Sequence, residues 1–387
     1  MSEGKILVGT RKGTFFVEKR GGRWTPELKG HAGSGVSFVA RDPSTKTVWA
    51  LLGHGHWGAK LSRSRDGGAS WEDAAQIKYP EGARYLGHPM PGEDGAMPTP
   101  TFKDATLLKL WCAAFGPNGR VYVGTIPGGL FESHDGGESF ELNRGLWNHD
   151  SRGGDLFAGD GNGTTHWFGT PASEGGEFAP GIHSIVVDPR NADRVLVAVS
   201  TAGVLETTDG GKTWRGRNQG MLNDYLPDPA AEWGHDPHFI DLCPGAPDHV
   251  WQQNHSGVFY SRDGAATWSR VSDKDRGVHF GFPVATDDED GRTAWLVPGR
   301  ADNERMAIDG GLFVARTTDG GESWTQLREG LPQQHAYDVI YRHALDQRGG
   351  ALAFGSTTGN LYVSEDRGES WQTAANNLPP IYSVRFG

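Results

Sequence analysis

The chain has 387 residues and a formal net charge of −11 at pH 7, from 37 Lys and Arg against 48 Asp and Glu. This acidic balance argues against nucleic acid or an anionic membrane as a partner, and no apolar run is long enough to span a membrane. The first residues, MSEGKILVGTRKG, contain no apolar secretory core, and the chain has two cysteines, Cys112 and Cys243. We therefore expect reduced thiols and a cytoplasmic protein.

A β-rich run interrupted by a turn recurs along the chain. The first lies at residues 6–18, and later runs read VYVGTIPGGLFES, VLVAVSTAGVLET, VWQQNHSGVFYSR and ALAFGSTTGNLYVS. Apolar runs of strand length that are divided by a turn predict β-hairpins. The 58 Gly and 14 Trp residues, with little helical patterning, agree with an all-β chain.

A short motif with the pattern [S/T]-x-D-x-[G/A]-x-[S/T]-[W/F] follows the hairpins. It occurs six times, ending at Trp71, Phe140, Trp214, Trp268, Trp324 and Trp371. The Asp carboxylate can accept hydrogen bonds from nearby backbone N–H groups, a Gly supplies a positive φ, and the final aromatic ring packs between sheets. We therefore assign a turn-forming and not a catalytic role to Asp66, Asp135, Asp209, Asp263, Asp319 and Asp366.

This motif resembles the Asp-box, or BNR repeat, of sialidase-like β-propellers. The resemblance implies that each copy closes the outer hairpin of one four-stranded blade. A degenerate seventh copy, VEKRGGRW, ends at Trp24, and the interval from Trp24 to Trp71 equals that from Trp324 to Trp371. We therefore predict an all-β fold that is one seven-bladed β-propeller over residues 1–387.

The C-terminal run at 381–387 reads as a lone strand, which should complete blade 1 beside residues 5–30 and close the ring. The other blades are predicted at residues 35–80, 106–146, 182–218, 238–273, 278–330 and 335–378. Long insertions, expected on one face of the ring, lie at residues 85–105, 148–180, 216–237 and 299–310. Because such loops are usually functional, we expect this face to carry the site.

Histidines recur near the predicted start of four innermost strands. In blades 4 and 5, His183 and His238 each precede a Pro by six residues, and blades 6 and 7 begin with His279 and His335. The ends of second strands add His255 and His54. Since convergent imidazoles suit a transition metal, we predict one Zn, Fe, Mn or Cu ion. The candidate ligands are His54, His183, His238, His279 and His335. Alternatively, these side chains are polar residues that line a wet channel.

The main functional hypothesis is a metal-dependent hydrolase or lyase that acts on a small polar molecule at this His-rich mouth. A metal would polarise a carbonyl or activate water. The candidates for acid–base and other catalytic work are His255, Asp236, Asp338 and Glu232. The candidates for substrate binding are Arg11 and Arg300 for an anionic group, and Asn254, Trp233 and Trp57.

Two other function classes stay open. Runs such as GHDPHFI, VWQQNHSGVF and LPPIYSVRF resemble bacterial propellers labelled BNR-repeat glycosyl hydrolases or exo-α-sialidase-like proteins, which implies a sialidase-like glycoside hydrolase. However, the Arg-Ile-Pro motif of sialidases is missing, no Arg triad can be assigned, and xyloglucan-degrading propeller enzymes use two propellers. The third class is a non-enzymatic scaffold with a protein partner, as the resemblance to photosystem assembly factors and sortilin-type receptors implies.

Overall fold

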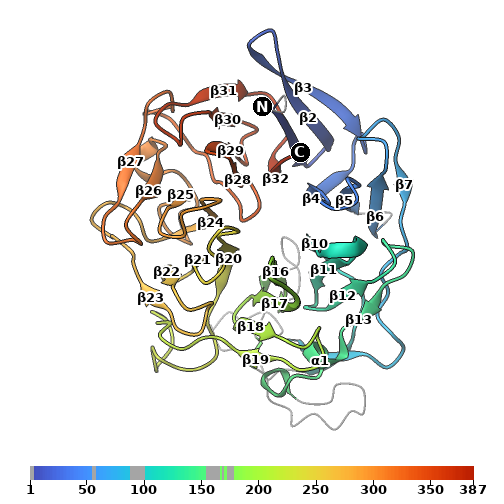
Figure 1. Ribbon diagram of the computed structural model, residues 1–387. Helices are drawn as coiled ribbons and strands as arrows, with labels where there is room; N and C mark the ends of the chain where they lie inside the picture. Colours follow the sequence, from blue (N-terminus) through green and yellow to red (C-terminus); the bar gives the residue numbers. More distant parts are fainter. Residues whose placement is uncertain (1–3, 55–57, 88–100, 154–165, 168–169, 172–177) are drawn as a thin grey trace.

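The computed structural model describes residues 4–54, 58–87, 101–153, 166–167, 170–171 and 178–387. Within these ranges, seven four-stranded antiparallel sheets surround a central axis like the blades of a propeller (Figure 1). The prediction of an all-β, seven-bladed β-propeller is therefore confirmed. Among the described residues, no helix has the length and apolar character needed to cross a membrane.

Each blade has its innermost strand at the axis and its outermost strand at the rim. Blade 1 consists of β32 (Ile381–Phe386), β1 (Lys5–Thr10), β2 (Gly13–Arg20) and β3 (Arg23–Gly30). Blade 2 consists of β4 (Gly35–Arg41), β5 (Val48–His54), β6 (Gly58–Ser64) and β7 (Glu72–Asp73). Blade 3 consists of β10 (Lys109–Phe115), β11 (Val121–Ile126), β12 (Leu130–Ser133) and β13 (Glu141–Leu142).

The remaining blades follow in chain order. Blade 4 consists of β16 (Ile182–Asp188), β17 (Asn191–Val199), β18 (Gly203–Thr207) and β19 (Arg215–Gly216). Blade 5 consists of β20 (Pro237–Leu242), β21 (Val250–Asn254), β22 (Gly257–Ser261) and β23 (Ser269–Arg270). Blade 6 consists of β24 (Gly281–Thr286), β25 (Ala294–Pro298), β26 (Val314–Thr317) and β27 (Thr325–Leu327). Blade 7 consists of β28 (Leu345–Arg348), β29 (Ala351–Gly355), β30 (Leu361–Ser364) and β31 (Gln372–Ala375).

Short elements lie in the connections between blades and between strands of one blade. Two small antiparallel pairs are formed by β8 (Arg84–Gly87) with β9 (Thr101–Asp104) and by β14 (Thr170–Pro171) with β15 (Phe178–Ala179). The helical pieces are α1 (Arg144–Trp147) and the 3₁₀ turns η1 (Pro117–Gly119), η2 (Asp150–Arg152) and η3 (Ile308–Gly310).

The ring is closed by strand pairing between the two ends of the chain. Strand β32 pairs antiparallel with β1, with Val384 opposite Val8, so the last strand is the innermost strand of the first blade. Figure 1 shows the two ends side by side in this sheet. This pairing supplies the fourth strand of blade 1 and joins the two ends of the chain in one sheet.

The six repeated motifs form one kind of turn. In the copy of blade 6, Oδ1 of Asp319 accepts hydrogen bonds from Thr317 Oγ1 at 2.7 Å and Ser323 N at 3.0 Å, and Oδ2 accepts one from Ser323 Oγ at 2.6 Å. Burial opposes ionisation of Asp319, but these hydrogen bonds lower its pKa to about 2. The ionised carboxylate therefore stabilises the turn through these hydrogen bonds.

The aromatic residue that ends most of these motifs links its blade to the previous one. The indole Nε1 of Trp324 donates to Val271 O at 2.9 Å, and Trp268 donates to Arg217 O at 2.7 Å. Between blades 5 and 6, Trp251 lies 6.0 Å from Trp324, centroid to centroid, inside a cluster of buried apolar side chains. The apolar core thus lies between neighbouring blades, where each fully buried large apolar side chain stabilises the fold by about 1.5–3 kcal/mol.

Candidate functional site at the channel mouth

The innermost strands carry a β-bulge at the same end of the channel. In the described part of the chain, six of the seven show a register shift there, and β28 is the exception. A bulge adds an unpaired residue to a strand and changes the direction of its side chain. The residues at the bulges are Ser37, Trp111, His183, His238, Phe282 with Pro283 and, on β32, Tyr382.

Side chains at these bulges bond to the backbone of the next blade. Ser37 Oγ donates to Leu110 O at 2.7 Å. His183 Nδ1 lies 2.7 Å from Pro237 O, and His238 Nδ1 lies 2.6 Å from Gly281 O. A carbonyl oxygen only accepts hydrogen bonds, so Nδ1 of each imidazole carries the proton and Nε2 of the neutral ring keeps its lone pair.

Asp236 is held at the mouth by the turns of two blades. It directly precedes β20, and its carbonyl oxygen accepts a hydrogen bond from His255 N at 2.9 Å, in the turn between β21 and β22. Its Oδ1 accepts a longer bond from Thr201 N at 3.3 Å, in the turn between β17 and β18. The carboxylate therefore lies where blades 4 and 5 meet.

Asp236, His238 and His255 form a compact group of metal-binding side chains. Oδ2 of Asp236 lies 3.4 Å from His238 Nε2 and 3.8 Å from His255 Nδ1. One potential ligand atom of each residue lies within 4.8 Å of the other two. The side chain of His238 is 2% exposed, whereas those of Asp236 and His255 are 16% and 30% exposed, so the group opens to solvent on their side.

The charges of this group favour a cation. Burial lowers the pKa of His238, although Asp236 acts in the opposite direction. Burial opposes ionisation of Asp236, but the hydrogen bond that a protonated His238 would donate, together with the charges of protonated His238 and His183 and of Arg342, holds its pKa well below the ordinary range. A neutral imidazole and a carboxylate thus present electron pairs to each other across a short gap. Two imidazoles and one carboxylate are a ligand set that suits a divalent transition metal.

Two cationic side chains lie against aromatic rings at the same mouth. The guanidinium carbon of Arg342 lies 5.2 Å from the ring centroid of Trp111 and 5.1 Å from that of Phe282. Because these rings belong to blades 3 and 6, the Arg342 side chain reaches from blade 7 across the channel. Lys109 Nζ lies 4.8 Å from the centroid of Trp111.

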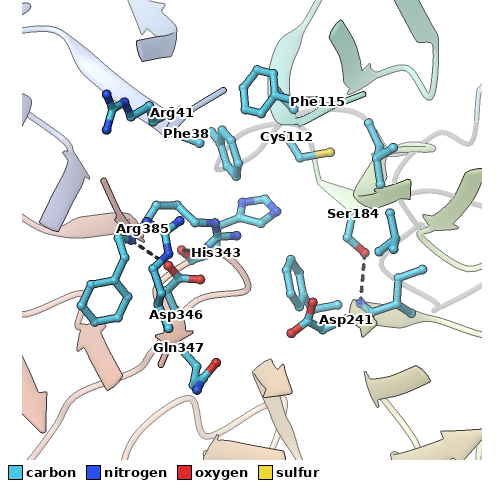
Figure 2. A pocket seen from close by; sticks show the side chains of 18 of the residues that line it. Phe38, Arg41, Cys112, Phe115, Ser184, Asp241, His343, Asp346, Gln347 and Arg385 are labelled. Carbon is cyan, nitrogen blue, oxygen red and sulfur yellow. Dashed lines mark hydrogen bonds between the residues drawn. The ribbon is translucent and has the colours of Figure 1, made fainter. Parts of the chain in front are cut away.

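The channel continues as a polar cavity beyond this layer. Figure 2 shows the cavity, which has a volume of about 320 Å³. Four of the residues that line the cavity come one position after the mouth residue of their blade: Phe38, Cys112, Ser184 and His343. Burial, together with the charge of Asp346, raises the pKa of Asp241 in this cavity to about 6.

The predicted alignment is wrong for blades 6 and 7. His279 precedes β24, and its Nε2 faces Asp224 Oδ2 at 3.7 Å, while Phe282 takes the bulge position. His335 is exposed and lies well before β28, which begins at Leu345. The prediction assumed that a histidine begins the innermost strand of each of these blades. In blade 7, the long connection between β27 and β28 instead brings Arg342 to the mouth.

Two predicted site residues have structural partners instead. Asp338 accepts hydrogen bonds from Thr358 Oγ1 and from Asn360 Nδ2, the latter at 2.8 Å, and so holds the turn between β29 and β30. Asn254 is buried, and its Nδ2 donates to Gln252 Oε1 at 2.6 Å. The structure does not bring either side chain to the group around Asp236.

Within the described chain, the other predicted residues make no hydrogen bond or ion pair with that group. Glu232 and Arg11 are exposed, and Arg300 pairs with Glu304 at 2.9 Å. Trp233 packs against His149, with ring centroids 5.6 Å apart. Trp57 and the side chain of His54 lie outside the described residues, so their predicted roles have no structural account.

The sequence hypothesis missed Arg342 and His343. His343 is buried, and its Nε2 donates to His183 O at 2.7 Å, which ties blade 7 to blade 4 across the channel. Its ring lies 5.2 Å from that of Phe38, centroid to centroid. No repeated sequence pattern marks these two residues, because β28 has no bulge and no Pro directly follows it.

No known family model matches the chain. The oligoxyloglucan-reducing end-specific xyloglucanase of Emericella nidulans is 25% identical over 238 residues, which are 53% of this chain and 27% of that enzyme. The chain thus spans about a quarter of the length of this curated relative, so the similarity covers a part of the enzyme.

Solved structures share the fold. An ancestral GH74 enzyme matches with a TM-score of 0.54 and 14% identity, over 100% of this chain and 40% of that one. A 6-phosphogluconolactonase candidate from Bacteroides uniformis matches with a TM-score of 0.55 and 12% identity, over 100% of both chains. In fold and in part of its sequence, the chain is therefore similar to glycoside hydrolases of the xyloglucanase type.

Proposed function

We propose that this chain is a hydrolase of a small polar molecule and that Asp236, His238 and His255 form its reaction centre. One observation carries the proposal: three potential metal ligands from one blade and its connector lie within 4.8 Å of one another at the channel mouth. A cation or a proton between these groups would be favourable, because their neighbouring electron pairs repel.

The surroundings of His238 fit a metal ligand. The carbonyl of Gly281 fixes the proton on Nδ1 and aims Nε2 at Asp236, which is how ligand histidines are commonly oriented. A bound metal would supply a Lewis acid that polarises a carbonyl or lowers the pKa of a water molecule. Asp236 would balance the charge of the ion, and His255, being more exposed, would face the substrate.

A glycoside hydrolase is the second candidate, and the sequence similarity to the xyloglucanase favours it. In this case the bond cleaved is glycosidic, and Asp236 would act as one of two catalytic carboxyl groups. The second would be Asp302, whose charge acts on Arg342 at the mouth. A retaining mechanism needs a separation of about 5–5.5 Å between the two carboxyl groups, and an inverting one about 6.5–9.5 Å.

Metal content and turnover together test the two candidates. The purified, tag-free protein and its His238→Ala and His255→Ala variants would be analysed for bound metals after reconstitution with Zn, Mn, Fe and Cu. Each would then be assayed on nitrophenyl glycosides, esters and lactones, with and without a chelator. His134→Ala is the matched control, because His134 is 60% exposed and belongs to the turn of blade 3.

We expect about one equivalent of metal and a chelator-sensitive activity, both lost in the two variants and kept in the control. Glycosidase activity that is insensitive to chelators and lost in Asp236→Asn would select the second candidate. Absence of both metal and turnover would overturn the proposal and favour a scaffold that binds a protein partner.

A further inference from the structure

In the part of the chain that the structure describes, Arg342 and Lys109 are cations that form no ion pair with a carboxylate. Their contacts at the mouth are with aromatic faces, and Nε of Arg342 is buried without a hydrogen-bond acceptor. Most arginines of this protein form an ion pair with a carboxylate. Arg194, for example, pairs with both Asp188 and Glu206 at 2.7 Å. A cationic pair at the mouth therefore stands out against a chain of net negative charge.

Removing charges from water is unfavourable unless counter-charges are supplied. Burial lowers the pKa of Arg342 to about 10 and that of Lys109 to about 8, and the charge of Arg342 acts on Lys109 in the same direction. Asp236 attracts Arg342, but its carboxylate already faces two histidines. An anion at the mouth would relieve the repulsion between the two cations.

We propose that Arg342 and Lys109 bind an anionic oxygen group of the substrate, a carboxylate or a phosphate. The proposal rests on the hydrolase function for the rest of the substrate, which would extend from this anion subsite toward Asp236, His238 and His255. The substrate class is then a small polar molecule with one acidic group.

The ring contacts explain why Arg342 suits this task. Its guanidinium lies near two aromatic faces, which restricts the orientation of the group and leaves its N–H edges for an acceptor. A planar, preorganised guanidinium can donate two parallel hydrogen bonds to a carboxylate or phosphate. The ring of Phe282 also packs against that of Tyr341, with centroids 5.7 Å apart. Aromatic walls of this kind exclude water and so strengthen the attraction between the guanidinium and a bound anion.

Calorimetric titration with small probes tests the anion subsite without turnover. The probes are acetate and glucuronate for a carboxylate, inorganic phosphate for a phosphate, and glucose as the neutral control, each measured at low and high salt. The variants are Arg342→Gln, Arg342→Lys and Lys109→Gln. Arg262→Gln is the matched control, because Arg262 is exposed in the repeated turn of blade 5.

We expect at least one anionic probe to bind about tenfold or more tightly than glucose, with the affinity falling as salt increases. Arg342→Gln and Lys109→Gln should each weaken binding about tenfold or more, Arg342→Lys less, and Arg262→Gln not at all. The probe that binds identifies the anion as carboxylate or phosphate. If Arg342→Gln does not fold, Lys109→Gln and the wild-type comparison with glucose still decide.

Binding of no anionic probe, or equal binding by wild type and both glutamine variants, would overturn the proposal. The same titrations on metal-free protein and on His238→Ala separate it from the hydrolase function. Anion binding that depends on Arg342 and persists in a protein without metal or turnover would support the anion subsite while the reaction centre fails.

Discussion

Nε2 of His238 lies 3.4 Å from Oδ2 of Asp236, and the hydrogen bond of Nδ1 to Gly281 directs the lone pair of Nε2 toward that oxygen. The two residues are two positions apart at the start of β20, and His238 is the bulged residue that has no partner on β21. A bulge re-aims the side chain of its extra residue. The candidate reaction centre therefore lies at the bulge of blade 5.

Neutralising Asp236 should weaken cation binding most directly. In Asp236→Asn the shape is kept but the negative charge is lost, so we expect the affinity for a reconstituted divalent metal to fall at least about tenfold. Equilibrium dialysis with metal analysis measures this. Asp275→Asn, which changes an exposed carboxylate elsewhere, should bind metal as the wild type does. Unchanged metal affinity in Asp236→Asn would contradict the proposed ligand set.

His343 should position Arg342 and stabilise the ring. In His343→Ala the carbonyl of His183 loses its donor and a cavity opens beside Phe38, so we expect the free energy of unfolding to fall by about 2–4 kcal/mol. We also expect KM for an anionic substrate to rise while kcat changes little. Urea unfolding and steady-state kinetics measure the two effects, with His134→Ala as control. A fall in kcat at constant KM would contradict the positioning role.

The repeated turns should contribute stability and leave the chemistry unchanged. Asp319→Ala removes the acceptor for Thr317 and Ser323, and we expect the free energy of unfolding to fall by about 1–3 kcal/mol. Glu322→Ala, at a side chain 81% exposed, should change it by less than about 0.5 kcal/mol. Loss of turnover in folded Asp319→Ala would contradict the assignment of this motif to structure.

The same carboxylates should make the protein sensitive to acid. The pKa of Asp319 is about 2 in the folded protein, against an ordinary value of about 3.9. Its stabilising contribution is therefore complete above about pH 4 and is lost as the pH falls through 2. Unfolding measured between pH 5 and 2 should show a smaller loss of stability in Asp319→Ala than in the wild type, and parallel curves would refute this account.

The contribution of Asp241 to stability should have the opposite pH dependence. Burial raises its pKa to about 6, so its contribution is complete below about pH 4 and is lost as the pH rises through 6. Asp241→Asn stays neutral, and its stability relative to the wild type should increase between pH 4 and pH 7.5. Denaturant titrations at these two pH values provide the test, and a constant difference would show that Asp241 does not titrate in this range.

The blade number could be predicted because each repeated turn is a local structure. Its Asp, Gly and hydroxyl residues form their hydrogen bonds within one short segment, so the sequence pattern and the turn correspond directly. The alignment of the mouth depends on bulges and on contacts between distant blades. The histidine pattern therefore did not predict which residues lie at the mouth in blades 6 and 7.

A spacing pattern marks the bulges of four blades but does not extend to blade 7. Each bulged residue of blades 2 to 5 precedes a Pro by six residues, as Ser37 precedes Pro43 and Trp111 precedes Pro117. No Pro directly follows β28, and its pairing with β29 has no register shift, so this pattern gives no position for Arg342.

The pairing of β32 with β1 also makes the order of the blades cyclic. Gly387 N donates to Lys5 O at 2.9 Å, so the two chain ends meet within one sheet. A circularly permuted gene that links these ends and opens the chain between blades would keep every sheet and every contact at the mouth. Such permutants would allow fluorescent labels or partner proteins to be fused beside any chosen blade while the channel mouth stays intact.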